Sequence, residues 1–300
     1  MVILSGQANP HLAQAVAEKI GATAGEVDIQ KFKNGEKRIR IATPVRDERV
    51  VIIQSLSQPV DEHFVELLLL IDAAERAGAE ETTVVMPWMG YSLQDKTFQD
   101  GMPMSARVIA DSISHQHVHQ VFLADLHNPS VAGFYSVPTR ILNTFPLFAS
   151  HIREHVGQDF VVVAPDFGGL KRAHSYAQQL NAPLAHIEKT RDLETGEVTI
   201  HSLTGADIQG KACIVIDDVV STGSTVVEVA EALEKAGAKN SHFYVTHFLY
   251  VPESLEKLTN SPLSSIVITD SVSPSGGSPQ SPKLTILSLA DTITNELKKH

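Results

Sequence analysis

The sequence predicts an α/β protein made of two tandem domains, each with a mainly parallel β-sheet flanked by helices. Short runs rich in Val and Ile alternate with amphipathic segments along the chain, as expected where helices connect parallel strands. The alternation starts again near residue 148, after the segment Asn143–Pro146. The length of 300 residues also suits two domains of ordinary size.

Six apolar runs are predicted to be buried strands, because they are too short for independent helices and are rich in β-branched residues. They are Val50–Ile53, Thr83–Met86, Val121–Ala124, Phe160–Ala164, Ala212–Ile216 and Phe243–Thr246. A seventh strand, Lys283–Leu287, follows a loop rich in Ser, Pro and Gly.

Helices are predicted between the strands. Glu66–Gly78 and Pro103–Ile113 are amphipathic, and so is the segment from Val226 to Leu233, in which apolar residues recur at spacings of three and four. A last helix is expected from Asp291 towards the terminus. No low-complexity linker marks the junction, so we expect two closely packed domains, residues 1–147 and residues 148–300.

The composition excludes several classes of protein. Hydrophobic residues make up 43% of the chain and charged residues 20%, as in an ordinary soluble globular protein. A net charge of -11 and the lack of a Lys/Arg cluster argue against nucleic-acid binding. Small anionic substrates stay compatible, since a few cations and backbone amides hold a phosphate.

The sequence also predicts a cytoplasmic protein with no membrane association. Its one cysteine, Cys213, cannot form an internal disulfide, and its place in an apolar run favours a small core residue over a nucleophile. The N-terminus lacks the basic and apolar regions of a signal peptide. The most apolar stretch, Val65–Ala74, is too short to span a bilayer and carries Asp72.

The most informative segment is Ile214–Val226, in which an apolar strand ends in Asp217 and Asp218. A loop of small residues, Ser221–Thr225, follows, and a helix starts at once. Ligands of open parallel sheets bind at the carboxyl ends of strands, and amides at a helix N-terminus hold phosphate. The two acids can accept hydrogen bonds from vicinal sugar hydroxyls, directly or through a cation. The segment predicts a sugar-phosphate site; the alternative is a capped strand-to-helix turn.

Other short motifs accompany this segment along nearly the whole chain. They are F-K-N-G-E at Phe32–Glu36, M-P-W-M-G-Y-S-L-Q-D-K at Met86–Lys96, A-D-L-H at Ala124–His127, G-F-Y at Gly133–Tyr135, P-D-F-G-G-L-K-R-A at Pro165–Ala173, E-K-T-R at Glu188–Arg191 and V-I-T-D at Val267–Asp270. In this order they resemble the ribose-phosphate pyrophosphokinase family, also called phosphoribosyl pyrophosphate synthetases. The resemblance implies two phosphoribosyltransferase-like domains of the type I fold.

The resemblance implies an enzyme that moves the β,γ-diphosphate of ATP to the 1-hydroxyl of ribose 5-phosphate and releases AMP. Lys189 and Arg191 would be catalytic, as two cations on a flexible loop that clamps the transferred diphosphate. Ribose 5-phosphate would bind the acid pair and its loop, that is Asp217, Asp218, Ser221, Thr222, Gly223, Ser224 and Thr225. Ser221 and Ser224 replace a common aspartate and a common glycine of the family but keep hydroxyl donors.

The resemblance assigns Mg²⁺ to His127 and Asp166. Each follows an apolar strand, so both can meet at the junction of the domains. An imidazole is an unusual ligand for a hard cation that prefers oxygen, so water and ATP oxygens would complete the coordination.

The resemblance also assigns two segments to ATP. The residues are Phe32, Asn34, Gly35, Glu36, Leu93, Gln94 and Asp95. Most family members carry an arginine that contacts ATP where this chain has Leu93, which puts nucleotide affinity and donor choice in question. Lys96 is a nearby cation that could compensate. The stretch Thr97–Gly101 is less basic than the regulatory loop of phosphate-activated members, which leaves control by phosphate or ADP open.

Two rival functions remain, a catalytically silent regulatory homologue and a phosphoribosyltransferase that consumes the activated sugar. Only Leu93 favours the silent homologue. The presence of two complete α/β blocks argues against the phosphoribosyltransferase. The family forms ATP sites between subunits, so self-association to a dimer or larger, up to a hexamer, is expected. The alternating His115, His117 and His119 could suggest zinc, but they are better explained as a polar connection from helix to strand.

Overall fold

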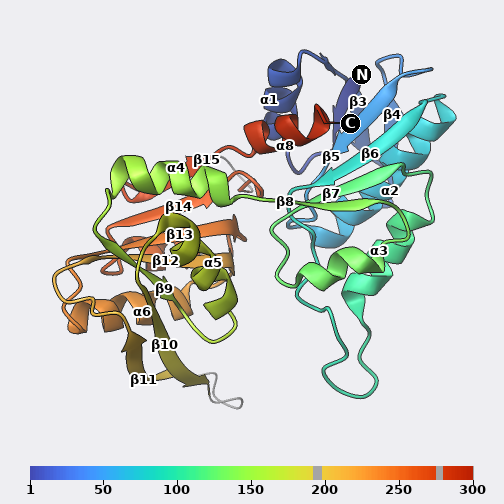
Figure 1. Cartoon of the computed structure of the whole chain (residues 1–300). Helices are drawn as coiled ribbons and strands as arrows, with labels where there is room; N and C mark the ends of the chain where they lie inside the picture. Colours follow the sequence, from blue (N-terminus) through green and yellow to red (C-terminus); the bar gives the residue numbers. More distant parts are fainter. Residues whose placement is uncertain (192–197, 275–279, 300) are drawn as a thin grey trace. The chain divides into compact units, whose positions relative to one another are not determined.

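The computed structural model describes residues 1–191, 198–274 and 280–299, with the side chains of residues 189–191 and 198–201 left out. The chain is α/β, with two mainly parallel sheets flanked by helices, which confirms the predicted fold class (Figure 1). By their contacts, residues form two compact units, each with one of these sheets.

The first unit has a six-stranded parallel sheet in the order β2-β1-β5-β6-β7-β8. Its strands are β1 (Val2–Ser5), β2 (Thr23–Ala24), β5 (Arg49–Ile53), β6 (Glu81–Met86), β7 (Gln120–Ala124) and β8 (Thr139–Leu142). A separate antiparallel hairpin consists of β3 (Val27–Lys31) and β4 (Lys37–Ile41). The helices are α1 (Pro10–Ile20), α2 (Val60–Arg76), α3 (Ser105–Ser114), the short 3₁₀ helix η1 (Pro129–Phe134) and α8 (Ala290–Leu297).

The second unit has a seven-stranded sheet in the order β11-β10-β9-β12-β13-β14-β15, parallel except for the pair β10 and β11. Its strands are β9 (Phe160–Ala164), β10 (Leu184–Arg191), β11 (Val198–Gly205), β12 (Ala212–Val220), β13 (Asn240–Phe248), β14 (Ser265–Thr269) and β15 (Leu284–Leu287). The helices are α4 (Phe145–His155), α5 (Leu170–Leu180), α6 (Ser224–Lys235) and α7 (Ser254–Thr259). Apolar side chains cover both faces of this sheet, as a buried parallel sheet requires.

Six predicted strands lie within observed ones, and the seventh, Lys283–Leu287, begins one residue before β15. Several elements are longer than the sequence indicated. Strand β12 continues through the acid pair to Val220, because β13 pairs with it as far as Val220 and Phe248. Helix α2 begins at Val60 instead of Glu66, with Asp61 and Glu62 in its first turn, where negative charge is favourable.

The end of the chain belongs to the first unit, in contrast to the expected second domain of residues 148–300. Asp270–Ser273 and Ser288–His300 group with Met1–Thr144. The buried Asn9 side chain donates hydrogen bonds to the Asp270 and Ser271 carbonyls at 3.3 Å each. Helix α8 packs beside α1, where Lys19 Nζ lies 2.7 Å from Asp291 Oδ1 (Figure 1). The composition does not predict that the C-terminal residues join the first unit, because this depends on polar contacts between residues far apart in the chain.

Two further features concern the helices and the histidines of the described residues. The helices there include none with the length and apolarity needed to cross a membrane. Residues His115 to His119 connect α3 with β7, and no metal-binding group of three His, Cys, Asp or Glu residues occurs in the described part of the chain.

Candidate active site

The predicted phosphate loop forms a strand-to-helix turn in the second unit. Strand β12 ends at Val220, and α6 begins at Ser224 with Gly223 as its N-cap. Gly223 has φ +78°, a left-handed conformation that glycine adopts readily. Ser221 and Thr222 are exposed, and the first turn of α6 has no acidic residue. The turn therefore presents backbone amides and hydroxyls to an anion without local repulsion.

A positive charge lies beside this loop. Lys257 Nζ on α7 donates to Ser224 Oγ at 3.0 Å. The sequence analysis missed Lys257, because the lysine lies 33 residues beyond its partner and no motif marks it. Its ammonium group attracts a phosphate, as the helix N-terminus also does.

The acid pair lies on the last part of β12. Asp218 is only 4% exposed, and Arg172 Nη2 on α5 lies 3.4 Å from its Oδ2. Part of Asp217 is open to solvent, yet protein atoms surround its carboxyl group closely. This burial raises the pKa of Asp217 well above its usual range, and the negative charges of Asp218 and Asp166 raise it further.

Asp166 lies two residues after the end of β9, the strand next to β12 in the sheet. Its Oδ1 accepts a hydrogen bond from the amide of Gly169, the N-cap of α5, at 2.9 Å. Because β9 and β12 are parallel, their carboxyl ends lie at the same edge. This edge accordingly gathers Asp166, the acid pair and the phosphate loop.

Lys189 and Arg191 belong to β10, which corrects the expectation that they lie on a loop. Strand β9 pairs with β10 only up to His186, opposite Ala164. Beyond that point β10 continues in an antiparallel pair with β11, with a register shift between Glu188 and Lys189. Lys189 and Arg191 are therefore on a two-stranded extension past the end of β9. The expected flexible loop, at residues 192–197, lies outside the described residues.

The predicted Leu93–Asp95 segment lies in the first unit, after β6. Two hydrogen bonds hold Gln94. Its backbone carbonyl accepts one from Ala106 N at 3.1 Å, and its side-chain oxygen accepts one from Ser105 Oγ at 2.7 Å. Asp95 Oδ2 accepts a hydrogen bond from Asn128 Nδ2 at 2.6 Å, next to the predicted metal ligand His127. The structure thus brings this segment and the His127 region together.

Leu93 is 37% exposed, so part of its side chain is open to solvent. The nearby Lys96 ammonium lies 5.1 Å from the ring centroid of Phe98, a cation–π contact. Tyr91, with φ +64°, donates a short hydrogen bond to Asp61 in the first turn of α2. This bond ties the turn before Leu93 to the helix.

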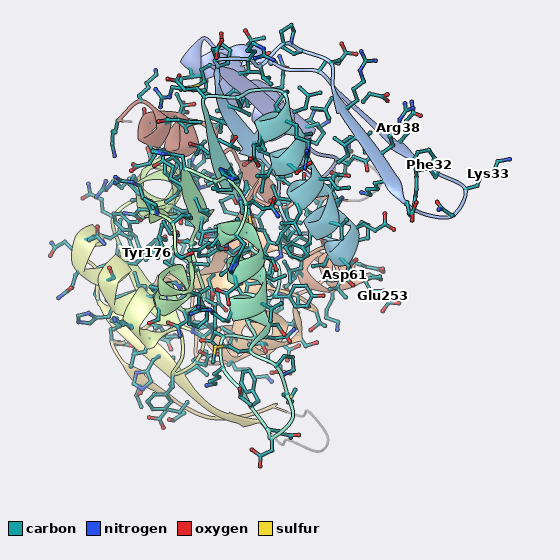
Figure 2. The ribbon with its side chains drawn as sticks, turned by 90° about the vertical axis from the view of Figure 1, so that its right-hand side faces the viewer. Phe32, Lys33, Arg38, Asp61, Tyr176 and Glu253 are labelled. Carbon is teal, nitrogen blue, oxygen red and sulfur yellow. The ribbon has the colours of Figure 1, made fainter. Side chains whose placement is uncertain are left out.

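The other predicted ATP segment forms the turn of the β3–β4 hairpin. Phe32 N donates to the Glu36 carbonyl at 2.8 Å, and Gly35 N donates to the Phe32 carbonyl at 2.9 Å. Asn34 Oδ1 accepts from Glu36 N at 3.2 Å, and Gly35 has φ +94°. Phe32 is 52% exposed, and Figure 2 shows it with Lys33 at the outer end of the hairpin. Among the described residues, no backbone hydrogen bond joins this turn to Leu93–Asp95.

Comparison with known proteins identifies the family. Residues 1–116 match the family described as the N-terminal domain of ribose phosphate pyrophosphokinase, and residues 144–276 match the phosphoribosyl transferase domain. The ribose-phosphate pyrophosphokinase of Agrobacterium fabrum is 34% identical over 100% of this chain and 96% of its own. The chain belongs to the ribose-phosphate pyrophosphokinase family.

Other pyrophosphokinases agree with this assignment. The enzyme of Oceanobacillus iheyensis is 36% identical over 97% of this chain and 91% of its own. The crystal structure of phosphoribosylpyrophosphate synthetase from Mycobacterium smegmatis superposes with a TM-score of 0.90 at 29% identity, covering 99% of this chain and 97% of that one. The resemblance seen in the sequence motifs is confirmed at the level of the family.

The donor set in this pyrophosphokinase-family chain fits a Mg²⁺ ion. Asp166, Asp217 and Asp218 concentrate negative charge at one sheet edge, and their repulsion shows in the raised pKa of Asp217. A divalent cation relieves such repulsion. Within the described residues no three side chains form a complete metal site. Mg²⁺ commonly keeps several waters and takes substrate phosphate oxygens as ligands, so it needs few protein ligands.

Gly223→Ala tests whether the loop conformation of this pyrophosphokinase-family chain serves phosphate binding. An added Cβ would lie 3.0 Å from Leu258 Cγ, in a backbone conformation that costs alanine about 1 kcal/mol. We expect lower stability in urea unfolding and weaker ribose 5-phosphate binding in calorimetry. Gly210→Ala is the control, because its φ of +70° imposes similar strain with nothing within 4 Å of the Cβ. Equal loss of ribose 5-phosphate affinity in both variants would contradict a role for the loop.

Proposed function

We propose that this protein transfers the β,γ-diphosphate of ATP to the 1-hydroxyl of ribose 5-phosphate, forming 5-phospho-α-D-ribose 1-diphosphate and AMP. The observation that carries the proposal is the sheet edge of the second unit. There an acid pair for sugar hydroxyls adjoins a helix N-terminus for a phosphate. Full-length similarity to ribose-phosphate pyrophosphokinases supports the same activity.

In the proposed mechanism the second unit orients the sugar. The 5-phosphate binds to the loop amides and to the hydroxyls of Ser221, Thr222 and Thr225. The nearby Lys257 also binds it. Asp217 and Asp218 accept hydrogen bonds from the ribose hydroxyls, and Arg172 holds Asp218 in place. Fixing the sugar in this way places its 1-hydroxyl for attack on the β-phosphorus, and such positioning supplies much of the acceleration in phosphoryl-type transfers.

The first unit binds the nucleotide in this proposal. Gln94 and Asp95 hold ATP, and Asn128 and Ser105 keep the two side chains in place. Asp166 and His127 would hold Mg²⁺, and the ion would neutralise charge on the phosphates of ATP. Lys189 and Arg191 bind the transferred diphosphate as its bond to AMP breaks.

The exposed hairpin turn, with Phe32, Asn34 and Glu36, supports self-association, because it can complete the nucleotide site of a second copy. We therefore propose a homodimer or a larger ring of a cytoplasmic enzyme. Its mass in solution, measured by light scattering with and without ATP and Mg²⁺, tests the association. A monomer under both conditions would contradict it.

The activity assay follows AMP and the diphosphate sugar together in a mixture of purified protein, ATP, ribose 5-phosphate and Mg²⁺. We expect the two products in a one-to-one ratio, and none when EDTA removes the metal. ADP in place of AMP would contradict transfer of a diphosphate. Consumption of the diphosphate sugar with a free base would indicate a phosphoribosyltransferase.

A second candidate, the silent regulatory homologue, rests on Leu93 alone. The variant Leu93→Arg separates the two functions. If the native protein is the enzyme, it turns over ATP and the variant mainly lowers the KM for ATP. If it is the silent homologue, the native protein binds ribose 5-phosphate without forming AMP.

A further inference from the structure

Two lysines face each other across the hairpin that carries the proposed ATP-binding turn. Lys31 of β3 and Lys37 of β4 are register partners, and Lys37 directly follows Glu36. Both reach acids of α2 that lie four residues apart. Lys31 Nζ is 2.9 Å from Glu62 Oε1, and Lys37 Nζ is 2.5 Å from Glu66 Oε2. The outer end of the hairpin is thus joined to α2 by two close ion pairs, and Lys37 Nζ also lies 3.9 Å from Glu62 Oε2.

The two ion pairs differ sharply in burial. The side chains of Lys31 and Glu62 are 52% and 45% exposed, whereas those of Lys37 and Glu66 are 7% and 0% exposed. An exposed pair contributes about 0–1 kcal/mol, because water screens it. A buried pair fixes one geometry, because separating the charges would leave each of them desolvated and unpaired.

Further hydrogen bonds satisfy the buried pair. Glu66 Oε1 accepts from Gln7 N at 2.6 Å and from Gln54 Nε2 at 2.8 Å. Lys37 Nζ also donates to Gln7 Oε1 at 3.2 Å. The space is so tight that a Cβ on Gly6 would lie 2.3 Å from Glu66 Oε1. Lys37 is therefore fastened both to α2 and to the loop after β1, two fixed parts of the first unit.

This network lies between the apolar inner end of the hairpin and its exposed turn. The apolar Val27, Ile39 and Ile41 pack on the core at its inner end. The turn from Phe32 to Glu36 is exposed, and a lone two-stranded hairpin is only marginally stable in water. Lys37 lies between these parts, so its position sets the direction in which the turn extends.

We propose that the buried Lys37–Glu66 pair is a positioning device that sets the β3–β4 turn for nucleotide binding. The proposal deepens the proposed function and rests on it. Lys37 need not touch ATP; it acts through Glu36 and the turn. A misplacement of about 1 Å can cost a hundredfold in rate, so loss of this anchor has a large effect on ATP use.

The test compares Lys37→Met with the matched control Lys31→Met, which removes the exposed pair of the same hairpin. We expect Lys37→Met to raise the KM for ATP by about tenfold or more, with the KM for ribose 5-phosphate unchanged. Lys31→Met changes both constants by less than about threefold. Equal effects of the two variants on the KM for ATP would overturn the proposal.

A double variant separates positioning from mere stability. Lys37→Met leaves Glu66 buried without its cation and lowers the melting temperature. Lys37→Met/Glu66→Gln removes both charges, so it recovers most of the melting temperature. We expect the KM for ATP to stay raised in the double variant. Recovery of both quantities together would show a purely structural role and overturn the proposal.

Hydrogen exchange gives a readout that does not depend on activity. Amides of the hairpin, residues 27–41, exchange faster in Lys37→Met and in the double variant than in Lys31→Met. Unchanged exchange in all three would overturn the proposal even if the native protein had no pyrophosphokinase activity. Absence of AMP from the native protein, with this exchange pattern intact, would instead contradict only the proposed function.

Discussion

Replacing Lys189 by alanine is expected to lower kcat by about a hundredfold to a thousandfold. Strand β10 carries Lys189 past the end of β9, whose last residue precedes Pro165 and Asp166. A cation there can bind the diphosphate while its bond to AMP breaks. Removing a group that binds mainly the transition state lowers kcat more than it raises the KM.

Steady-state kinetics with AMP as the measured product check this prediction. Lys239→Ala serves as the control, because this exposed lysine lies just before β13, at the opposite end of the same sheet. It changes kcat by less than about twofold, as surface substitutions usually do. A fall in kcat of less than about tenfold in Lys189→Ala, no more than about 1.4 kcal/mol, would remove Lys189 from the catalytic step.

Asp217→Asn is expected to weaken ribose 5-phosphate binding by about tenfold to a hundredfold, because hydrogen bonds to a charged group contribute about 1.5–3 kcal/mol. The same substitution should stabilise the free protein. Burial, Asp218 and Asp166 raise the pKa of Asp217 in the folded state, so its ionised form is unfavourable there. The neutral asparagine removes that penalty.

The stability gain depends on pH in a defined direction. A carboxyl whose pKa is raised by folding favours the folded state below its unfolded pKa of about 3.9, and loses this contribution as the pH rises through the raised value. The advantage of Asp217→Asn therefore grows from about pH 4 upwards. Urea unfolding at pH 5 and pH 8, without Mg²⁺ or substrate, measures it.

Asp159→Asn is the control for this experiment, since Asp159 is exposed just before β9, away from the acid pair. It should change neither stability nor ribose 5-phosphate affinity. A loss of stability in Asp217→Asn at pH 8 would show that the charged carboxylate is favourable in the folded protein. A loss of stability together with unchanged affinity would also remove Asp217 from the sugar site.

The strand positions were predictable because each run of Val and Ile carries its own signal. The prediction failed where tertiary pairing extended an element past that signal. The charged pair Asp217 and Asp218 is typical of the end of a strand, but β13 continues to pair with β12 as far as Val220. In the same way, pairing with β11 carries β10 beyond Ile187 to Arg191.

The fold class and the strand-to-helix turn of the predicted phosphate loop could be predicted from the sequence alone. Strand, acid pair, small-residue loop and helix follow one another without a break, so local geometry alone brings them together. Which charged residues form ion pairs depends on the tertiary structure. Arg172 pairs with Asp218, and Lys37 pairs with Glu66, because the order of strands and the packing of helices bring these residues close. Such pairs join residues far apart in the chain, and a single sequence contains no periodicity that reports them.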